Sequence, residues 1–180
     1  MKTIERAANL CLIVASLSVV GTIMYDRWHR PSAIPVSSSA LLQRYKDTVP
    51  PLPGAVASQR TATIVLFLSR GCRYCNQSMP FYQRLVHLKA KAPSDLGLVA
   101  FVPEVERAGD EIAYLQANGI KVDSVGTVNF REVGVPGTPT VLLLDARGHA
   151  QGAWLGLLND VQESELLFAV SQLCPACTEG

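Results

Sequence analysis

The sequence predicts an α/β domain with a mixed β-sheet that is flanked by helices on both faces and preceded by one N-terminal transmembrane helix. Short apolar runs of strand length alternate with helical segments after residue 60, and an uncharged stretch lies near the N-terminus. Hydrophobic residues make up 48% of the 180 residues, charged residues make up 17%, and the formal net charge is +1. We therefore expect a sizeable buried core, and we expect no nucleic-acid partner, because no run of like charge is present.

The uncharged stretch covers residues 7–25. A helix of this length spans roughly 28 Å, about the hydrocarbon thickness of a bilayer, and basic side chains flank both of its ends. The alternative is a cleaved signal peptide, but the nearby small-x-small triplet, residues 16–18, lies inside the apolar run. We expect a retained anchor that contacts the lipid bilayer through residues 7–25. Because short N-terminal anchors usually leave the bulk of the chain outside, we expect a single-pass protein with its C-terminal domain on the periplasmic or extracytoplasmic side.

The composition changes to Pro, Ser and Ala between residues 31 and 59. Residues 41–47 are a candidate short helix, and the rest is typical of a tether of mixed flexible and extended character. The predicted parts of the chain are an anchor (1–30), a tether (31–59), a folded domain (60–173) and a tail (174–180).

The folded domain contains eight predicted elements in the order β-α-β-α-β-β-β-α. The expected strands are 64–68, 96–102, 122–128, 141–144 and 151–155, and the last two are expected to pair as a hairpin. The expected helices are 73–91, 106–118 and 160–173. Gly119 is the predicted stop of the second helix, and Asp160–Glu163 is a capping-box-like start of the third. Parallel strands followed by antiparallel ones indicate a mixed sheet.

Two of the five cysteines, Cys72 and Cys75, form a Cys-x-x-Cys pair directly after the first predicted strand. Cys72 opens a helix, where free N–H groups and the positive end of the helix dipole stabilise a thiolate. Arg70 and Arg73 add positive charge nearby. Because the thiolate is the nucleophile of disulfide exchange, Cys72 is the expected attacking group, and the more enclosed Cys75 is the expected resolving group. The alternative is a structural thiol pair or half of a zinc site, but no His or further Cys pair follows at zinc-finger spacing.

Two blocks of the sequence resemble known redox proteins. The segment from Phe67 to Pro80, with its Cys-Arg-Tyr-Cys motif and Met79-Pro80, resembles the active-site segment of the thioredoxin superfamily. It is most similar to the membrane-anchored TlpA-type thiol–disulfide oxidoreductases. Residues 133–140 resemble the cis-proline loop of the same family, and the whole resemblance covers roughly residues 61–173.

The resemblance implies a thioredoxin-like fold and a thiol–disulfide oxidoreductase that needs no cofactor and no metal. It implies that Pro139 is a cis-proline that faces the cysteine pair, and that Thr138 offers its backbone to an incoming peptide strand. Protein thiols or disulfides are the implied partners, and a membrane redox protein is a second candidate. The implied site residues are Cys72, Cys75 and Pro139 as catalytic groups, with Thr138, Arg73 and Tyr74 as substrate-binding groups.

Three positions depart from the family pattern. Leu66 stands where thioredoxin carries a buried acid, and Ser78 stands where cytochrome-maturation members often have one. Gly71 replaces the usual Trp before the first cysteine. Proton transfer must therefore use another group, with Glu104 or water as candidates, and a specific role in apocytochrome reduction is not implied.

Two other functions remain as alternatives. One is a peroxiredoxin-like peroxidase, although the Pro-x-x-x-Thr-x-x-Cys segment of such enzymes does not precede Cys72. The other is a thioredoxin-fold interaction or assembly module whose cysteines are structural. Reduction of a disulfide by the protein, measured beside peroxide consumption, separates these functions from the first.

A second Cys-x-x-Cys pair, Cys174 and Cys177, follows the last predicted helix. That helix is expected to carry the chain about 20 Å away from the active-site end of the sheet. We therefore predict that the tail pair forms its own disulfide or meets a partner protein, and that it takes no part in catalysis.

Overall fold

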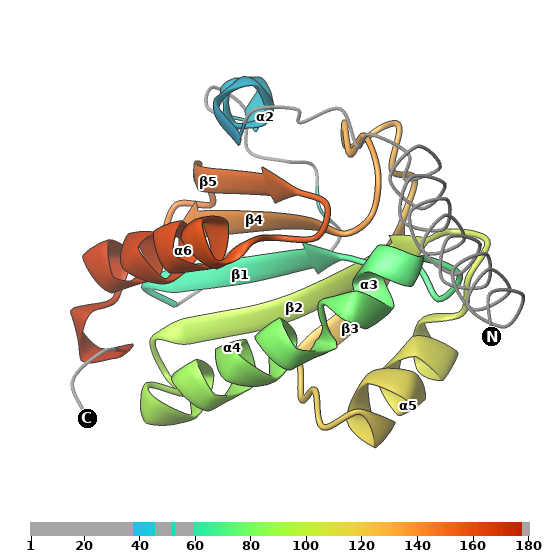
Figure 1. The fold of residues 1–180 in the computed structure, drawn as a ribbon, viewed down its shortest axis with the longest axis horizontal. Coiled ribbons are helices and arrows are strands. Elements are labelled where there is room, and N and C mark those ends of the chain that lie inside the picture. The colour runs from blue at the N-terminus through green and yellow to red at the C-terminus, as the bar shows by residue number, and fades with distance from the viewer. Residues whose placement is uncertain (1–37, 46–51, 53–59, 178–180) are drawn as a thin grey trace, which may run out of the picture. The chain divides into compact units, whose positions relative to one another are not determined.

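The apolar runs form one five-stranded mixed sheet with the strand order β3-β2-β1-β4-β5 (Figure 1). Its strands are β1 (Ala62–Phe67), β2 (Leu96–Pro103), β3 (Ser124–Val128), β4 (Thr140–Asp145) and β5 (Ala150–Leu155). The three strands β1, β2 and β3 are parallel, whereas β4 is antiparallel to β1 and β5 is antiparallel to β4. The computed structural model describes residues 38–45, 52 and 60–177, and within them it confirms the predicted mixed sheet.

The central strands are buried on both faces, which explains why their sequences are continuously apolar. Every residue of β1 is buried, and only the last residue of β2 is partly exposed. Val65 of β1 lies opposite Val99 of β2 and Leu142 of β4. β3 is an edge strand with a mostly exposed or half-buried pattern, in keeping with its weaker sequence signal.

Helices cover both faces of the sheet. They are α2 (Ser38–Tyr45), α3 (Arg73–Gln77), α4 (Met79–Lys91), α5 (Ala108–Ala117) and α6 (Asp160–Leu173), followed by the 3-10 turn η1 (Pro175–Cys177). Side chains of α3, α4, α5 and α6 pack in one core cluster with Ile64 and Leu66 of β1. Side chains of α2 pack in a second cluster with Val65 and Phe67, which point to the opposite face.

The helix predicted from Arg73 to Lys91 is in fact two helices that meet at Ser78. Pro80 has no N–H to donate to the carbonyl of Asn76, so the helical ladder is interrupted there. The N–H of Ser78 donates to the carbonyl oxygens of Tyr74 and Cys75, at 3.0 and 3.1 Å. Ser78 is therefore the last residue of one helical stretch and the first of the next.

The ends of the other helices follow ordinary capping rules. Gly119, with φ of +74°, follows α5 as predicted. The capping box of α6 begins one residue earlier than predicted, at Asn159 rather than Asp160. The Asn159 side chain accepts a hydrogen bond from the Gln162 N–H at 3.0 Å, and the Gln162 side chain accepts one from the Asn159 N–H at 3.1 Å.

One segment of the predicted tether belongs to the folded unit. α2 lies within residues 31–59, and it buries Leu41 and Tyr45 in the second core cluster beside β5. The two residues are four positions apart, so they share one face of the helix. The tether prediction is therefore corrected for Ser38–Tyr45, and the folded unit is larger than residues 60–173.

The predicted membrane anchor, residues 7–25, lies outside the described residues. Among the helices in the described ranges, none is both long enough and apolar enough to cross a bilayer.

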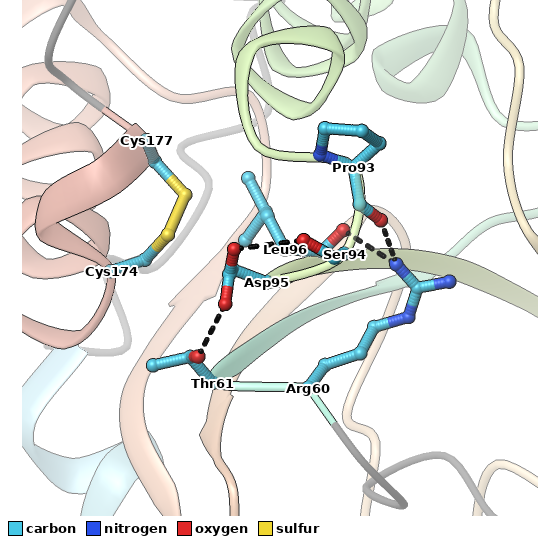
Figure 2. Close-up of a disulfide and its surroundings, with 8 residues drawn as sticks. All are labelled: Arg60, Thr61, Pro93, Ser94, Asp95, Leu96, Cys174 and Cys177. Atoms are coloured by element: carbon cyan, nitrogen blue, oxygen red, sulfur yellow. Dashed lines mark hydrogen bonds between the residues drawn. A yellow bond between two sulfur atoms is a disulfide. The ribbon is translucent and has the colours of Figure 1, made fainter.

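A disulfide joins Cys174 and Cys177 at the end of α6 (Figure 2). Both cysteines are buried, and η1 packs against α4. The surroundings drawn in Figure 2 include Thr61, before β1, and Leu96, the first residue of β2. Cys72 instead follows the last residue of β1, so the tail disulfide lies at the opposite end of that strand. The prediction of a local disulfide is confirmed.

Candidate active site

Cys72 and Cys75 lie at the start of α3, where the chain leaves the carboxyl end of β1. Cys72 is the N-cap residue of α3, with an extended backbone, and its sulfur accepts a hydrogen bond from the Cys75 N–H at 3.4 Å. The turn before it is closed by the Cys72 N–H, which donates to the Ser69 carbonyl at 3.0 Å. Both thiols are free, Cys72 is partly exposed, and Cys75 is 2% exposed. The site therefore holds one accessible and one enclosed thiol on the same helical turn.

The pKa of Cys72 lies below that of an ordinary thiol. Partial burial is the largest single influence and opposes ionisation, but hydrogen bonding to the Thr138 side chain, to Cys75 and to the Tyr74 backbone outweighs it. Cys72 is therefore ionised to a greater extent at neutral pH than a free cysteine, and its thiolate is a nucleophile.

The pKa of Cys75 is shifted in the opposite direction. Burial raises it to about 12, and the neighbouring Cys72 raises it as well, while hydrogen bonds from the Ser69 backbone and the Thr138 side chain lower it. Cys75 is therefore protonated at neutral pH, and it must lose its proton before it can attack a disulfide.

The loop that precedes β4 brings Thr138 and Pro139 to the cysteines. The Thr138–Pro139 peptide bond is cis, as the resemblance implies. β4 pairs antiparallel with β1, and Thr140 lies opposite Phe67, so the residues before Thr140 reach the end of β1 where the cysteines begin. The Cys72 thiol donates a hydrogen bond to the Thr138 carbonyl at 3.1 Å. Two segments that are 66 residues apart in sequence thus meet at one sulfur atom.

Arg73 and Tyr74, the two residues between the cysteines, lie on the outer side of α3. Arg73 is exposed and Tyr74 is half-buried. The Arg73 guanidinium lies 5.0 Å from the centre of the Tyr74 ring and donates to the Tyr74 hydroxyl at 3.2 Å. The two side chains therefore support each other next to the accessible thiol.

The acid that forms hydrogen bonds with the active-site turn is Glu106, and not Glu104, the candidate from the sequence. Glu104 is exposed, and no hydrogen bond in the described ranges joins it to either cysteine. Glu106 accepts hydrogen bonds from the Ser69 hydroxyl at 2.6 Å and the Arg70 N–H at 3.2 Å. Glu111 is 2% exposed, and burial followed by the charge of Glu106 raises its pKa, against the opposing charge of Arg70.

The local sequence does not reveal Glu106 and Glu111, because these residues, just before and within α5, are distant from the cysteines along the chain. α5 contacts the active-site segment through the Asp110 backbone and the Tyr114 side chain. The Arg70 guanidinium donates to the Asp110 carbonyl at 3.2 Å and lies 5.6 Å from the centre of the Tyr114 ring. The Tyr114 hydroxyl donates to the Asn76 side chain at 2.9 Å. No signal in the local sequence pattern could have revealed these contacts.

Within the described ranges, no group of three or more His, Cys, Asp or Glu side chains is arranged to hold a metal ion.

No protein-family model matches the sequence, and no curated protein matches it. Several solved structures are similar to it. A thiol-disulfide isomerase from Corynebacterium glutamicum has a TM-score of 0.53 and 16% identity over 72% of this chain and 88% of that chain. A secreted thiol-disulfide isomerase from the same organism has a TM-score of 0.51 and 13% identity over 68% and 73%. A DsbF homologue from Corynebacterium diphtheriae has a TM-score of 0.51 and 13% identity over 65% and 74%.

These identities show the fold alone. The chain has the thioredoxin-like fold seen in thiol–disulfide oxidoreductases, and it carries the adjacent Cys72 and Cys75 thiols at the start of the helix after β1. The predicted resemblance to thioredoxin-fold oxidoreductases is thereby confirmed.

Proposed function

We propose that this protein is a thiol–disulfide oxidoreductase that exchanges disulfides with protein substrates through Cys72 and Cys75. The observation that carries the proposal is the contrast between the two thiols. One is accessible with a lowered pKa, and the other is enclosed with a pKa of about 12, one helical turn away on a thioredoxin-like fold. A structural thiol pair has no need of such a difference in exposure and ionisation.

The proposed reaction has two displacements. The Cys72 thiolate attacks one sulfur of the substrate disulfide, and the other substrate sulfur leaves with the electron pair and takes a proton from water. Cys75 then loses its proton and attacks the Cys72 sulfur, and the second substrate sulfur leaves in the same way. The Cys72–Cys75 pair becomes a disulfide as the substrate gains two electrons, and the same steps in reverse oxidise a substrate dithiol.

The loop before β4 is the proposed peptide-binding element. In the free protein the Thr138 carbonyl accepts a hydrogen bond from the Cys72 thiol. That thiol proton is absent once Cys72 is bonded to a substrate sulfur, so the carbonyl becomes available to a substrate N–H. Pro139 would face the mixed disulfide, and Arg73 and Tyr74 would contact the substrate from the exposed side of α3.

We also propose that residues 7–25 anchor the protein in a membrane, with the domain on the periplasmic or extracytoplasmic side. The buried Cys174–Cys177 disulfide supports this compartment, because disulfides persist where the surroundings are oxidising. A secreted protein is among those of similar structure. A membrane redox protein is then an accessible partner, alongside protein thiols or disulfides.

The test of the proposed activity is the reduction of insulin disulfides by dithiothreitol in the presence of the full-length protein. The protein should accelerate the reduction, and Cys72→Ser should abolish the acceleration. The matched control replaces Cys174 and Cys177 together with Ser, which should leave the rate nearly unchanged because that disulfide lies at the other end of β1. Absence of any acceleration, or an equal loss in the control variant, would contradict the proposal. Peroxide consumption, measured in parallel, would instead favour a peroxidase.

A further inference from the structure

The resolving step requires Cys75 to ionise inside the protein core. Its sulfur is enclosed, and its pKa of about 12 leaves very little thiolate at neutral pH. Neither Leu66 nor Ser78 supplies a carboxylate next to it, and Glu104 is exposed. A buried anion needs a hydrogen-bond donor, because an unpaired charge in the core is very unfavourable.

Tyr82 of α4 carries a deeply buried hydroxyl group. Its side chain is 1% exposed, and its hydroxyl forms no hydrogen bond of ordinary geometry among the described residues, although the Ser78 hydroxyl lies close enough to lower its pKa. A buried hydroxyl without a partner costs about 1–3 kcal/mol, and buried tyrosines usually have one. A phenylalanine would fill the same space without that cost, so the hydroxyl calls for an explanation beyond packing.

The spacing of Cys75, Ser78 and Tyr82 places them on one helical face. They are separated by three and four residues, which are the spacings at which side chains lie above one another. The Ser78 N–H donates to the Tyr74 carbonyl of α3 at 3.0 Å, and the Ser78 carbonyl accepts from the Tyr82 N–H of α4 at 3.1 Å, so Ser78 joins the last turn of α3 to the first turn of α4. Long helical side chains lean toward the N-terminus, which for Tyr82 is the direction of Ser78 and Cys75. Cys75 and Tyr82 belong to the same buried cluster.

The electrostatic coupling agrees with this geometry. Burial raises the pKa of Tyr82, and negative charge on Cys75 raises it further, with a smaller effect from Cys72 and an opposing one from the Ser78 hydroxyl. The Tyr82 hydroxyl therefore responds more strongly to a charge on Cys75 than to a charge on Cys72. It also stays protonated at any physiological pH, so it acts as a donor and never as a base.

We propose that Tyr82 is a catalytic hydrogen-bond donor to Cys75, a proposal that depends on the oxidoreductase function proposed above. In the resolving step Cys75 gives its proton to water, and the Tyr82 hydroxyl donates to the sulfur as it becomes a thiolate. That sulfur attacks Cys72, the bond between Cys72 and the substrate breaks, and the leaving sulfur takes a proton from water. Tyr82 keeps its own proton throughout.

Ellman's reagent separates the two steps in one stopped-flow experiment. Attack by Cys72 releases the first thionitrobenzoate, and attack by Cys75 on the mixed disulfide releases the second. The full-length protein is used in a Cys11→Ser background, and it is reduced under native conditions that leave the buried tail disulfide intact, as checked by mass. Tyr82→Phe should leave the first phase unchanged and slow the second. The loss of the donor should lower the thiolate fraction of Cys75 about tenfold. Because the remaining, more basic thiolate is also more nucleophilic, the second phase should slow about threefold.

Tyr45→Phe is the matched control. Tyr45 is also a buried tyrosine whose hydroxyl has no partner among the described residues, but it packs in the core cluster on the other face of the sheet. It should change neither phase. Tyr82→Phe should unfold at the same or a higher denaturant concentration than the unsubstituted protein, because it removes an unpaired polar group.

The outcomes are distinct. Selective slowing of the second phase by Tyr82→Phe supports the inference. An unchanged second phase, equal slowing by Tyr45→Phe, or a Tyr82→Phe protein that no longer folds would overturn it while leaving the proposed function in place. An unsubstituted protein that releases no thionitrobenzoate through Cys72 would overturn the proposed function and this inference together.

Discussion

The pKa values of Cys72 and Cys75 are shifted in opposite directions because the two residues, one helical turn apart, lie in different environments. Cys72 receives hydrogen bonds at the helix start, whereas Cys75 faces the core cluster of β1 and α4. The effect of burial opposes ionisation at both sulfurs, but only at Cys72 do the hydrogen bonds outweigh it. The division of labour between attacking and resolving thiols is therefore a property of individual residues.

Alkylation of the reduced protein with iodoacetamide at neutral pH should label Cys72 well before Cys75. Only the thiolate reacts, so the rate at Cys72 should rise with pH and level off at a lower pH than for an ordinary cysteine. Labelling of Cys75, with a pKa of about 12, should stay slow and keep rising through mildly alkaline pH. Peptide mass spectrometry after timed quenching measures both rates, and faster labelling of Cys75 would reverse the assignment of roles.

At the scale of elements, α2 has a larger part in the fold than its sequence suggests. The segment is short and lies among Pro- and Ser-rich residues, yet Leu41 is fully buried against the sheet. α2 contacts β5, the edge strand opposite β3, and covers the face that α4 and α6 leave free. α2, which lies within the predicted tether, therefore forms the helical layer on the second face of the sheet.

Leu41→Ala should lower the free energy of unfolding by about 2–5 kcal/mol, the usual cost of such a truncation in a core. The control is Gln43→Ala on the exposed side of the same helix, which should change stability by less than about 0.5 kcal/mol. Urea unfolding of the full-length protein, followed by circular dichroism, compares the two variants. Similar small effects would mean that α2 does not contribute to the stability of the domain.

For the whole molecule, the two cysteine pairs occupy opposite ends of β1. The reactive pair follows its carboxyl end, where the loop before β4 also arrives, and the tail disulfide lies near its amino end. The antiparallel pairing of β1 and β4 therefore assembles a redox site at one end. The structural disulfide stays buried and out of reach of that site.

The full-length protein should remain in the membrane pellet after extraction with alkaline carbonate. This outcome is expected because residues 7–25 are uncharged and long enough to span a bilayer. A variant that lacks residues 1–30 is the control and should be released. N-terminal sequencing of the mature protein adds an independent check, since a mature chain that begins after Tyr25 would mean that the segment is a cleaved signal.

The amino-acid sequence determined the features that depend on neighbouring residues. The strand, turn and helix around Cys72 follow one another without interruption, so helix-end physics predicted an accessible thiol with a lowered pKa. The strands 64–68, 96–102 and 141–144 were predictable because continuous apolar runs are typical of buried strands. The cis peptide bond before Pro139 was predictable from a resemblance that covers the loop residue by residue.

Only the tertiary structure decided the features that join distant segments. Glu106 and Glu111 lie near Ser69 and Arg70 because α5 packs beside the active-site turn, and the local sequence carries no sign of that contact. In the sequence, Tyr82 is one of several residues on the apolar face of its helix. Only the structure shows that its hydroxyl is completely buried and forms no hydrogen bond of ordinary geometry. These features depend on which side chains the folded chain brings together and which polar atoms it leaves unpaired, whereas periodicity reports only which face of an element is buried.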